Sequence, residues 1–347
     1  MVENKEFHGR GAGKGMVETL LDVRNLSLEF ATEQGTYKAL ENLSFSVRYG
    51  EILGIVGESG CGKSVTSLSI LRLIPSPPGK IVGGEIFFEG RDVLKESYVA
   101  MRALRGNKIS MIFQEPMTSL NPLFTCGNQV MEAYRLHRKV SKKEAREKAI
   151  AMLELVGIPL PEKRVDEYPH QLSGGMRQRV MIAIAMACDP LLLIADEPTT
   201  ALDVSIQAQI LQLMKDLREK TRTAVMLITH DLGVIAETAD RVVVMYAGQI
   251  VEEASVKELF DTPKHPYTEG LLRCIPRADR TSEELIPIPG TVPSLNAMPE
   301  GCRFAPRCPF RRDVCDVLPP ELRVFSGESK VRCHRHNAAV WNGGAQA

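Results

Sequence analysis

The stretch GESGCGKS, Gly57–Ser64, follows the apolar run Ile52–Val56 and precedes a helix-like segment, Val65–Ile74. It matches the pattern G-x-x-x-x-G-K-[ST] in the strand–loop–helix context that this pattern requires. Glycines let successive backbone N–H groups turn inward around phosphate oxygens, and a helix N-terminus adds partial positive charge. Lys63 is expected to reach the outer phosphates and Ser64 to hold Mg²⁺. The sequence therefore predicts a nucleotide site made of eight consecutive residues: Gly57, Glu58, Ser59, Gly60, Cys61, Gly62, Lys63 and Ser64.

The composition is that of a soluble globular protein, with 347 residues, 44% hydrophobic and 25% charged. The formal net charge of +0 gives no reason to expect a nucleic-acid partner. The longest run almost free of charge, 180–195, is broken by Asp189-Pro190, so no membrane span is predicted. The N-terminus lacks the apolar core of a signal peptide, which predicts a cytoplasmic protein. Residues 1–16 are predicted to form a flexible tail, although GRGAGKG at 9–15 imitates a phosphate loop.

Around the phosphate loop, the patterning predicts an α/β fold with an added antiparallel layer. Alternating residues at 21–30 and 40–47 favour two strands of that layer, and another strand pair is expected to bracket Gly83-Gly84. The run Ile109–Phe113 favours a buried strand that ends in Gln114. Between about Thr125 and Gly157 the period becomes helical, with Ser141 and Glu144 as a capping box.

A second strand–helix alternation follows between Leu172 and Val251. Strands are expected at 191–195, 224–228 and 242–246, and helices at 205–220 and 232–239. Prolines beyond Asp261 leave room only for short helices. The predicted domains are an ATPase-like domain at 17–262, with a helical subdomain at about 115–172, and a C-terminal extension at 263–347.

The run LLLIADEP, Leu191–Pro198, supplies the second half of a nucleotide site. Its apolar strand delivers Asp196 and Glu197 at the carboxyl end, where open α/β sheets bind ligands. Asp196 suits Mg²⁺, and Glu197 is placed to orient or deprotonate the water that attacks the terminal phosphate. Gln114 is expected to contact Mg²⁺ or this water, and His230 to bond the γ-phosphate and position the base. A lone histidine or glutamine is more often structural.

The segment LSGGMRQR, Leu172–Arg179, predicts a second anion-binding surface. Ser173, Gly174 and Gly175 open a helix and expose a hydroxyl, N–H groups and a positive dipole end. One nucleotide does not need two such surfaces, so the pattern favours a dimer in which this surface covers the nucleotide of the other subunit. By itself it would be an ordinary start of a helix.

Together, these motifs resemble those of the ATP-binding-cassette ATPases in identity, order and spacing. The resemblance covers residues 20–260 and includes the ALD segment, 201–203. It implies that two cassettes close head to tail around two ATP molecules and separate after hydrolysis. It also implies the following residue roles: Ser173, Gly174, Gly175 and Gln178 serve the opposite ATP, Asp203 lies at the dimer seam, and Tyr37 stacks on adenine, with Phe30 as the competing candidate. Cys61 replaces the serine common in this loop.

A narrower resemblance rests on QEPMTSLNP, Gln114–Pro122, and HPYTEGLL, His265–Leu272. Both are similar to the ATPases of peptide and nickel importers, a group that includes some oligosaccharide importers. The stretch 71–84 resembles the first of two paralogous ATPases in such systems. This implies a paralogous ATPase as partner, two transmembrane permease subunits, an extracellular solute-binding protein and a place at the cytoplasmic face of the membrane. A short permease helix is expected to dock after Gln114.

Four of the eight cysteines, Cys302, Cys308, Cys315 and Cys333, are clustered with the spacing C-x5-C-x6-C-x17-C. Disulfides are not expected in a cytosolic ATPase, and structural zinc prefers closer pairs. The spacing leaves zinc and a [4Fe–4S] cluster open, and the importer resemblance implies the iron–sulfur cluster. His334 and His336 are expected to face solvent or to substitute as ligands.

The predicted function is an ATP-hydrolysing, energy-coupling subunit of an importer for peptides or a related solute. One alternative is a soluble cassette ATPase that acts on nucleic acid or ribosomes, for which a second cassette or a basic arm is missing. The other is a soluble cassette ATPase gated by an iron–sulfur redox or iron sensor.

Overall fold

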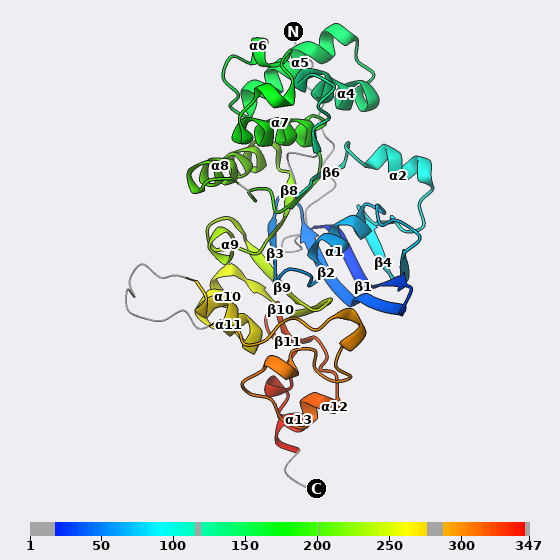
Figure 1. The fold of residues 1–347 in the computed structure, drawn as a ribbon, viewed down its shortest axis with the longest axis vertical. Coiled ribbons are helices and arrows are strands. Elements are labelled where there is room, and N and C mark those ends of the chain that lie inside the picture. Colours follow the sequence, from blue (N-terminus) through cyan, green and yellow to red (C-terminus); the bar gives the residue numbers. More distant parts are fainter. Residues whose placement is uncertain (1–17, 115–118, 201, 276–286, 344–347) are drawn as a thin grey trace.

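The structure is a computed structural model that describes residues 18–114, 119–200, 202–275 and 287–343. The predicted tail, 1–16, lies outside the described residues. In the part of the chain that is described, the strands form two sheets, one of four strands in the order β2-β1-β4-β5 and one of eight in the order β11-β12-β10-β9-β3-β8-β7-β6 (Figure 1). The fold is thus α/β with a separate antiparallel layer, as predicted.

The four-stranded sheet is antiparallel. Its strands are β1 (Thr19–Thr32), β2 (Gly35–Arg48), β4 (Gly79–Phe88) and β5 (Arg91–Asp92). The prediction of a strand pair around Gly83-Gly84 is wrong, because β4 runs through both glycines and pairs with β1 on either side of them. Gly84 has φ +94°, and a Cβ there would lie 2.6 Å from the Asn25 carbonyl oxygen. Arg24 pairs with Glu85 and Ser27 with Gly83, so Gly84 lies opposite a bulge in β1.

The eight-stranded sheet has a parallel centre. Its parallel strands are β3 (Ile52–Val56), β6 (Ile109–Ile112), β7 (Leu192–Asp196), β8 (Ala224–Thr229) and β9 (Arg241–Tyr246). Antiparallel strands extend one edge: β10 (Gln249–Ser255), β12 (Ser329–Val331) and β11 (Arg323–Ser326). These bounds confirm, to within one residue at each end, the strands predicted at 191–195, 224–228 and 242–246. β12 and β11 belong to the C-terminal extension, so the sheet crosses the predicted boundary at 262.

Both faces of the parallel strands are buried, and alternate residues enter different cores. Leu53 and Ile55 of β3 pack in a cluster with the four-stranded sheet. Ile52 and Val56 pack in the second cluster, which is formed mainly with helices. Strands that are buried on both faces have nearly continuous apolar sequences, and such runs allowed β3 and β7–β9 to be predicted from the sequence.

The helices divide between an upper lobe and the flanks of the sheet (Figure 1). The lobe contains α4 (Cys126–Arg138), α5 (Lys142–Leu155), α6 (Pro161–Arg164), the 3₁₀ turn η1 (Pro169–Gln171) and α7 (Gly174–Met186). The other helices with described bounds are α1 (Lys63–Ile70), α2 (Tyr98–Leu104), α8 (Val204–Thr221), α9 (Leu232–Thr238), α10 (Val256–Asp261), α11 (Pro266–Arg273), α12 (Val314–Val317) and α13 (Ala338–Gly343). Ser141 caps α5 by accepting from the Glu144 N–H at 3.2 Å.

The C-terminal extension forms the lower end of the molecule in Figure 1. Besides its two strands, it contains the short 3₁₀ turns η2 (Leu295–Ala297), η3 (Ala305–Arg307) and η4 (His334–His336). The short elements agree with the expectation from its prolines. Among the described helices, none is long and apolar enough to span a bilayer.

Candidate active site

The phosphate loop joins β3 to α1 and is shaped by its glycines. Gly57 has φ +154°, and a Cβ at this position would lie 2.2 Å from the Met245 carbonyl oxygen. Gly62, the residue before α1, has φ +103°, and its Cβ would lie 2.7 Å from Leu40 Cδ2. Side chains are excluded at both positions by packing and by the left-handed backbone. The predicted strand, loop and helix N-terminus are therefore brought together.

Lys63 is 6% exposed and is held inside the loop. Its Nζ donates to the Gly57 carbonyl at 2.7 Å and to the Glu58 carbonyl at 3.1 Å. The Cys61 thiol is buried 3.8 Å from this Nζ, and burial raises its pKa above the usual range. Cys61 thus fills the back of the loop with a neutral thiol, whereas Ser59 and Gly60 are exposed. The exposed side of the loop is therefore formed by small residues, Ser59 and Gly60.

Asp196 ends β7 beside α1 and fits a role in binding Mg²⁺. Its carboxylate is buried, and within the described residues its Oδ1 has no hydrogen-bond partner. Burial raises its pKa, while the Ser64 hydroxyl and the Lys63 charge act in the opposite direction. A buried carboxylate oxygen next to a hydroxyl is the donor set that Mg²⁺ prefers, and the cation would offset the cost of that burial. Asp196 and Ser64 would hold the ion, which would neutralise charge on the phosphates.

Glu197 follows Asp196 in a left-handed conformation, with φ +47°. Gln114 Nε2 donates to its Oε2 at 3.1 Å, and the Thr200 hydroxyl donates to the same oxygen at 3.0 Å. His230 Nδ1 lies 3.4 Å from the other oxygen, Oε1. Burial alone would raise the Glu197 pKa, but the Thr200 hydrogen bond and His230 outweigh it, and the pKa is lowered. The carboxylate is therefore kept ionised, as a proton acceptor must be.

These contacts bring three predicted catalytic residues, Gln114, Glu197 and His230, to one place. They stand at the carboxyl ends of the neighbouring strands β6, β7 and β8. Thr200 was missed, because a threonine in DEPTTALD has no special pattern apart from its position three residues after Glu197.

Tyr37, the predicted adenine-stacking residue, lies on β2 and is half-buried. Its hydroxyl donates to the Gln34 carbonyl at 2.9 Å, which fixes the ring at the β1–β2 turn. Further along β2, Leu40 contacts the position of Gly62, so this strand runs from Tyr37 to the phosphate loop. Phe30, the competing candidate, pairs directly with Tyr37 across the two strands.

The predicted second anion surface opens α7. Ser173 is exposed, and its hydroxyl accepts from the Met176 N–H at 3.3 Å. Gly174 and Gly175 follow without side chains, and a Cβ on Gly175 would lie 2.9 Å from Ile206 Cγ2 of α8. Asp203 is exposed and caps α8 by accepting from the Ile206 N–H at 2.9 Å. Ala201, the first residue of the ALD segment, lies outside the described residues.

Gln178 does not take part in that surface. It is 1% exposed, and its Nε2 donates to the Pro198 carbonyl. The helical period turns this fifth residue of α7 inward, and its assignment to the opposite ATP stays a prediction. Gln178 instead ties α7 to the segment that follows Glu197.

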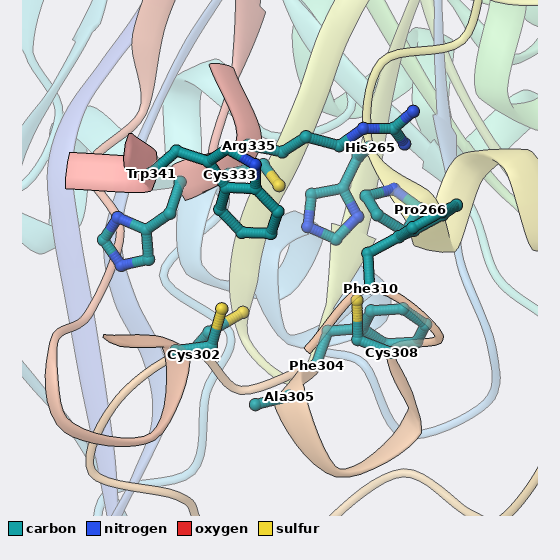
Figure 2. A pocket seen from close by; sticks show the side chains of 12 residues that line it. His265, Pro266, Cys302, Phe304, Ala305, Cys308, Phe310, Cys333, Arg335 and Trp341 are labelled. Atoms are coloured by element: carbon teal, nitrogen blue, oxygen red, sulfur yellow. The ribbon is translucent and has the colours of Figure 1, made fainter. Parts of the chain in front are cut away.

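Three of the clustered cysteines, Cys302, Cys308 and Cys333, direct their sulfur atoms toward one space (Figure 2). With Cys315 they line a cavity of about 20 Å³, which is room for about one water molecule. Burial raises the pKa of Cys302 to about 11 and of Cys333 to about 12. Across the described ranges, no group of three or more His, Cys, Asp or Glu side chains has the geometry of a metal site. The cavity as it stands does not fit a four-iron cluster.

The two histidines near this cavity are not free ligands. His334 is buried, with Nε2 2.7 Å from the Leu318 carbonyl oxygen, and His336 Nε2 is 2.8 Å from the Lys264 carbonyl oxygen. The expectation that His334 faces solvent is wrong, because β12 carries the following turn back against the sheet.

Comparisons with known proteins agree with this geometry. Residues 40–200 match the ABC transporter family, and residues 251–315 match the C-terminal region of oligopeptide/dipeptide transporters. A probable peptide ABC transporter ATP-binding protein of Sinorhizobium fredii, y4tR, is 56% identical over 93% of this chain and 97% of its own length. The chain belongs to the ABC transporter ATPases of the oligopeptide/dipeptide family.

Other members are similarly close to this ABC ATPase. The dipeptide transport ATP-binding protein DppD of Bacillus subtilis is 52% identical over 95% of this chain and 100% of its own length. Among solved structures, the ATP-binding cassette MJ0796, a dimer in a post-hydrolysis state bound to ADP and Pi, matches with a TM-score of 0.61 and 29% identity, over 68% of this chain and 98% of that one. The protein is thus an ATPase.

Proposed function

We propose that this ATPase powers the import of peptides through a membrane permease, with Glu197 as the residue that activates the attacking water. The proposal rests on the hydrogen bonds that Gln114 and Thr200 donate to the Glu197 carboxylate, with His230 beside it. A carboxylate held from several sides is preorganised to accept a proton without reorganising at each turnover. The peptide substrate is supported by the C-terminal match at 251–315 and by the names of the relatives.

The ATP site is proposed to be composite. Ser173 is exposed at the start of α7, a helix of 13 residues, in the upper lobe of Figure 1, whereas α1, which follows the phosphate loop, lies below this lobe near the middle of the molecule. In a head-to-tail dimer, this surface would cover the nucleotide of the other subunit, and the exposed Asp203 would lie at the seam. We propose a paralogous ATPase as the other subunit, on the basis of the resemblance of residues 71–84.

The permease is proposed to dock beside Gln114, at the cytoplasmic face of the membrane. Phe113, Leu123 and Phe124 flank this region in the sequence and are exposed, and Leu123 is 80% exposed. Large apolar side chains grouped on a surface mark contacts with other proteins. Residues 115–118, which complete the predicted docking region, lie outside the described residues. Two permease subunits and an extracellular solute-binding protein would complete the importer.

The transport role is tested by isolating the tagged chain from membranes of its own cell, followed by mass spectrometry and peptide uptake. We expect co-purification of a second ATPase, permease subunits and a solute-binding protein, and ATP-dependent uptake of labelled peptide by the complex in vesicles. Leu123→Ser should lower recovery of the permease, whereas the same change at Leu136, an exposed leucine that lies on α4, should not. Recovery of ribosomes or nucleic acid without a permease would contradict the proposal.

The four cysteines are proposed to hold an iron–sulfur cluster. The sulfur atoms of Cys302, Cys308 and Cys333 point into a cavity that Cys315 also lines, which supports the assignment, but the cavity must widen to admit the group. Anaerobic purification should give a brown protein with iron and acid-labile sulfide, and Cys308→Ser should lower both. Cys274→Ser, outside the cysteine cluster, is the control. A colourless protein with one zinc would contradict this assignment and leave the ATPase assignment intact.

A further inference from the structure

Arg307 of the C-terminal extension forms an ion pair with Glu58 of the phosphate loop. Arg307 is 6% exposed and lies at the end of η3, one residue before Cys308. Its Nη1 donates to Glu58 Oε2 at 2.6 Å and its Nη2 to Glu58 Oε1 at 3.0 Å, which makes a two-pronged ion pair. The remaining donors reach the Pro289 and Ile288 carbonyls and the Tyr246 hydroxyl. The guanidinium is thus fixed in position on every side.

The backbone of Glu58 is held from the same direction. Its N–H donates to the Tyr267 hydroxyl at 2.8 Å, and Tyr267 is fully buried on α11. The Glu58 carbonyl in turn accepts from Lys63 Nζ. The extension therefore fixes the side chain and the backbone N–H of Glu58. The Glu58 carbonyl positions Lys63, the residue predicted to bind the phosphates.

A rigid aromatic cluster supports both contacts. The ring of Phe304 lies 5.2 Å from that of Tyr246 and 5.5 Å from that of Tyr267, measured between centroids. Phe304 also lines the cysteine cavity, and the Arg307 N–H donates to its carbonyl at 3.0 Å. The segment that contains Cys302 and Cys308 thus also contains Arg307, whose side chain contacts Glu58.

We propose that Arg307 and Tyr267 are positioning residues for nucleotide binding, which hold the phosphate loop in the conformation that accepts the phosphates before the nucleotide binds. A loop ordered before binding loses less entropy when the ligand arrives, so its affinity is higher. Neither side chain is a catalytic residue, because each acts on the nucleotide only through Glu58. The C-terminal extension is therefore part of the ATP site, which also gives the cysteine turn a direct mechanical connection to that site.

The test compares ATP binding and hydrolysis by the full-length chain carrying Arg307→Met, Tyr267→Phe, Glu58→Gln and the double variant Glu58→Gln/Arg307→Met. We expect Arg307→Met to raise the Kd and KM for MgATP about tenfold and to leave kcat within about twofold, because the chemistry at Glu197 is unchanged. Glu58→Gln should weaken binding in the same direction. The double variant should be no worse than the poorer single variant, since both remove one contact.

The matched control is Arg332→Met. Arg332 also anchors the extension, through Nε to the Ile250 carbonyl at 2.8 Å and Nη1 to the Pro320 carbonyl at 3.2 Å, and both partners lie outside the phosphate loop. It should lower thermal stability without changing the Kd for MgATP. The proposal would be overturned if Arg332→Met and Arg307→Met lost equal affinity for MgATP. An unchanged Kd for MgATP in Arg307→Met would also overturn it, as would additive effects in the double variant. If Arg307→Met does not fold, Tyr267→Phe and Glu58→Gln decide it by the same criteria.

Discussion

Gln114 and Glu197, at the ends of the neighbouring strands β6 and β7, are joined by a hydrogen bond of 3.1 Å from Nε2 to Oε2. The bond spans 83 positions in the sequence and connects the entrance of the helical lobe to the proposed base. A shift of the Gln114 side chain would therefore change the contacts of Glu197. This contact gives the proposed docking of a permease a route to the chemistry of ATP.

Loss of this hydrogen bond should slow hydrolysis. Gln114→Ala frees one oxygen of Glu197, and we expect kcat to fall by about 10- to 100-fold, with a smaller change in KM. Steady-state phosphate release over a range of MgATP concentrations measures both parameters. Gln212→Ala, which removes an exposed glutamine bonded to Asp216 on α8, should leave both unchanged. Unaltered turnover in Gln114→Ala would show that Glu197 does not depend on this contact.

Packing of the helical lobe depends on Gly127. A Cβ on this residue of α4 would lie 2.1 Å from Val165 Cγ2 and 2.4 Å from the Val165 carbonyl oxygen. Gly127→Ala should therefore destabilise the lobe by about 1–3 kcal/mol, as overpacking does elsewhere. Urea unfolding measures the change. Gly83→Ala is the control, because its Cβ would meet its nearest neighbour, Ser27 Cβ, at 3.9 Å; equal stabilities of the two variants would refute this reading.

The pair of Glu41 and Arg303 should make stability depend on pH. Burial alone would raise the Glu41 pKa, but its bonds to Lys38 and Arg303 lower it below 4.5. A carboxylate with a lowered pKa stabilises the fold above its unfolded pKa, and this contribution is lost as pH falls through the folded pKa. Glu41→Gln should therefore cost about 2 kcal/mol near neutral pH, and the difference from wild type should shrink below about pH 4.5.

Urea unfolding of both proteins across this range provides the measurement. Glu321→Gln, which alters an exposed pair with Arg323, should show almost no effect at any pH. A Glu41→Gln difference that stays constant with pH would mean that the carboxylate charge does not contribute to the pair.

Much of the ATP site was predictable because it is built from local patterns. The phosphate loop needs glycines between a strand and a helix, and Asp196 and Glu197 directly follow an apolar strand. Such residues are read from neighbours in the sequence. The sequence did not indicate that Gln178 is buried, because only the packing of α7 on the segment after Glu197 shows it.

The contacts from the C-terminal extension had no such signal. Arg307 and Glu58 are 249 positions apart, and nothing in a proline-rich segment indicates which arginine returns to the phosphate loop. Tyr267 lies in the HPYTEGLL stretch used for the family resemblance, but the motif alone gives it no role. The contact between Arg307 and Glu58 depends on the pairing of β12 with β10, which brings the extension onto the sheet. The amino-acid composition does not indicate this pairing.

The central claim is that Glu197 activates the water in an ATP site closed by a second subunit. The most direct measurement is the turnover and assembly state of Glu197→Gln in MgATP. We predict that turnover falls by about 100-fold or more while ATP still binds, and that a nucleotide-loaded dimer accumulates and is lost on adding Ser173→Arg. Rapid turnover by Glu197→Gln, or a loaded form in which Ser173 remains solvent-exposed, would contradict the account.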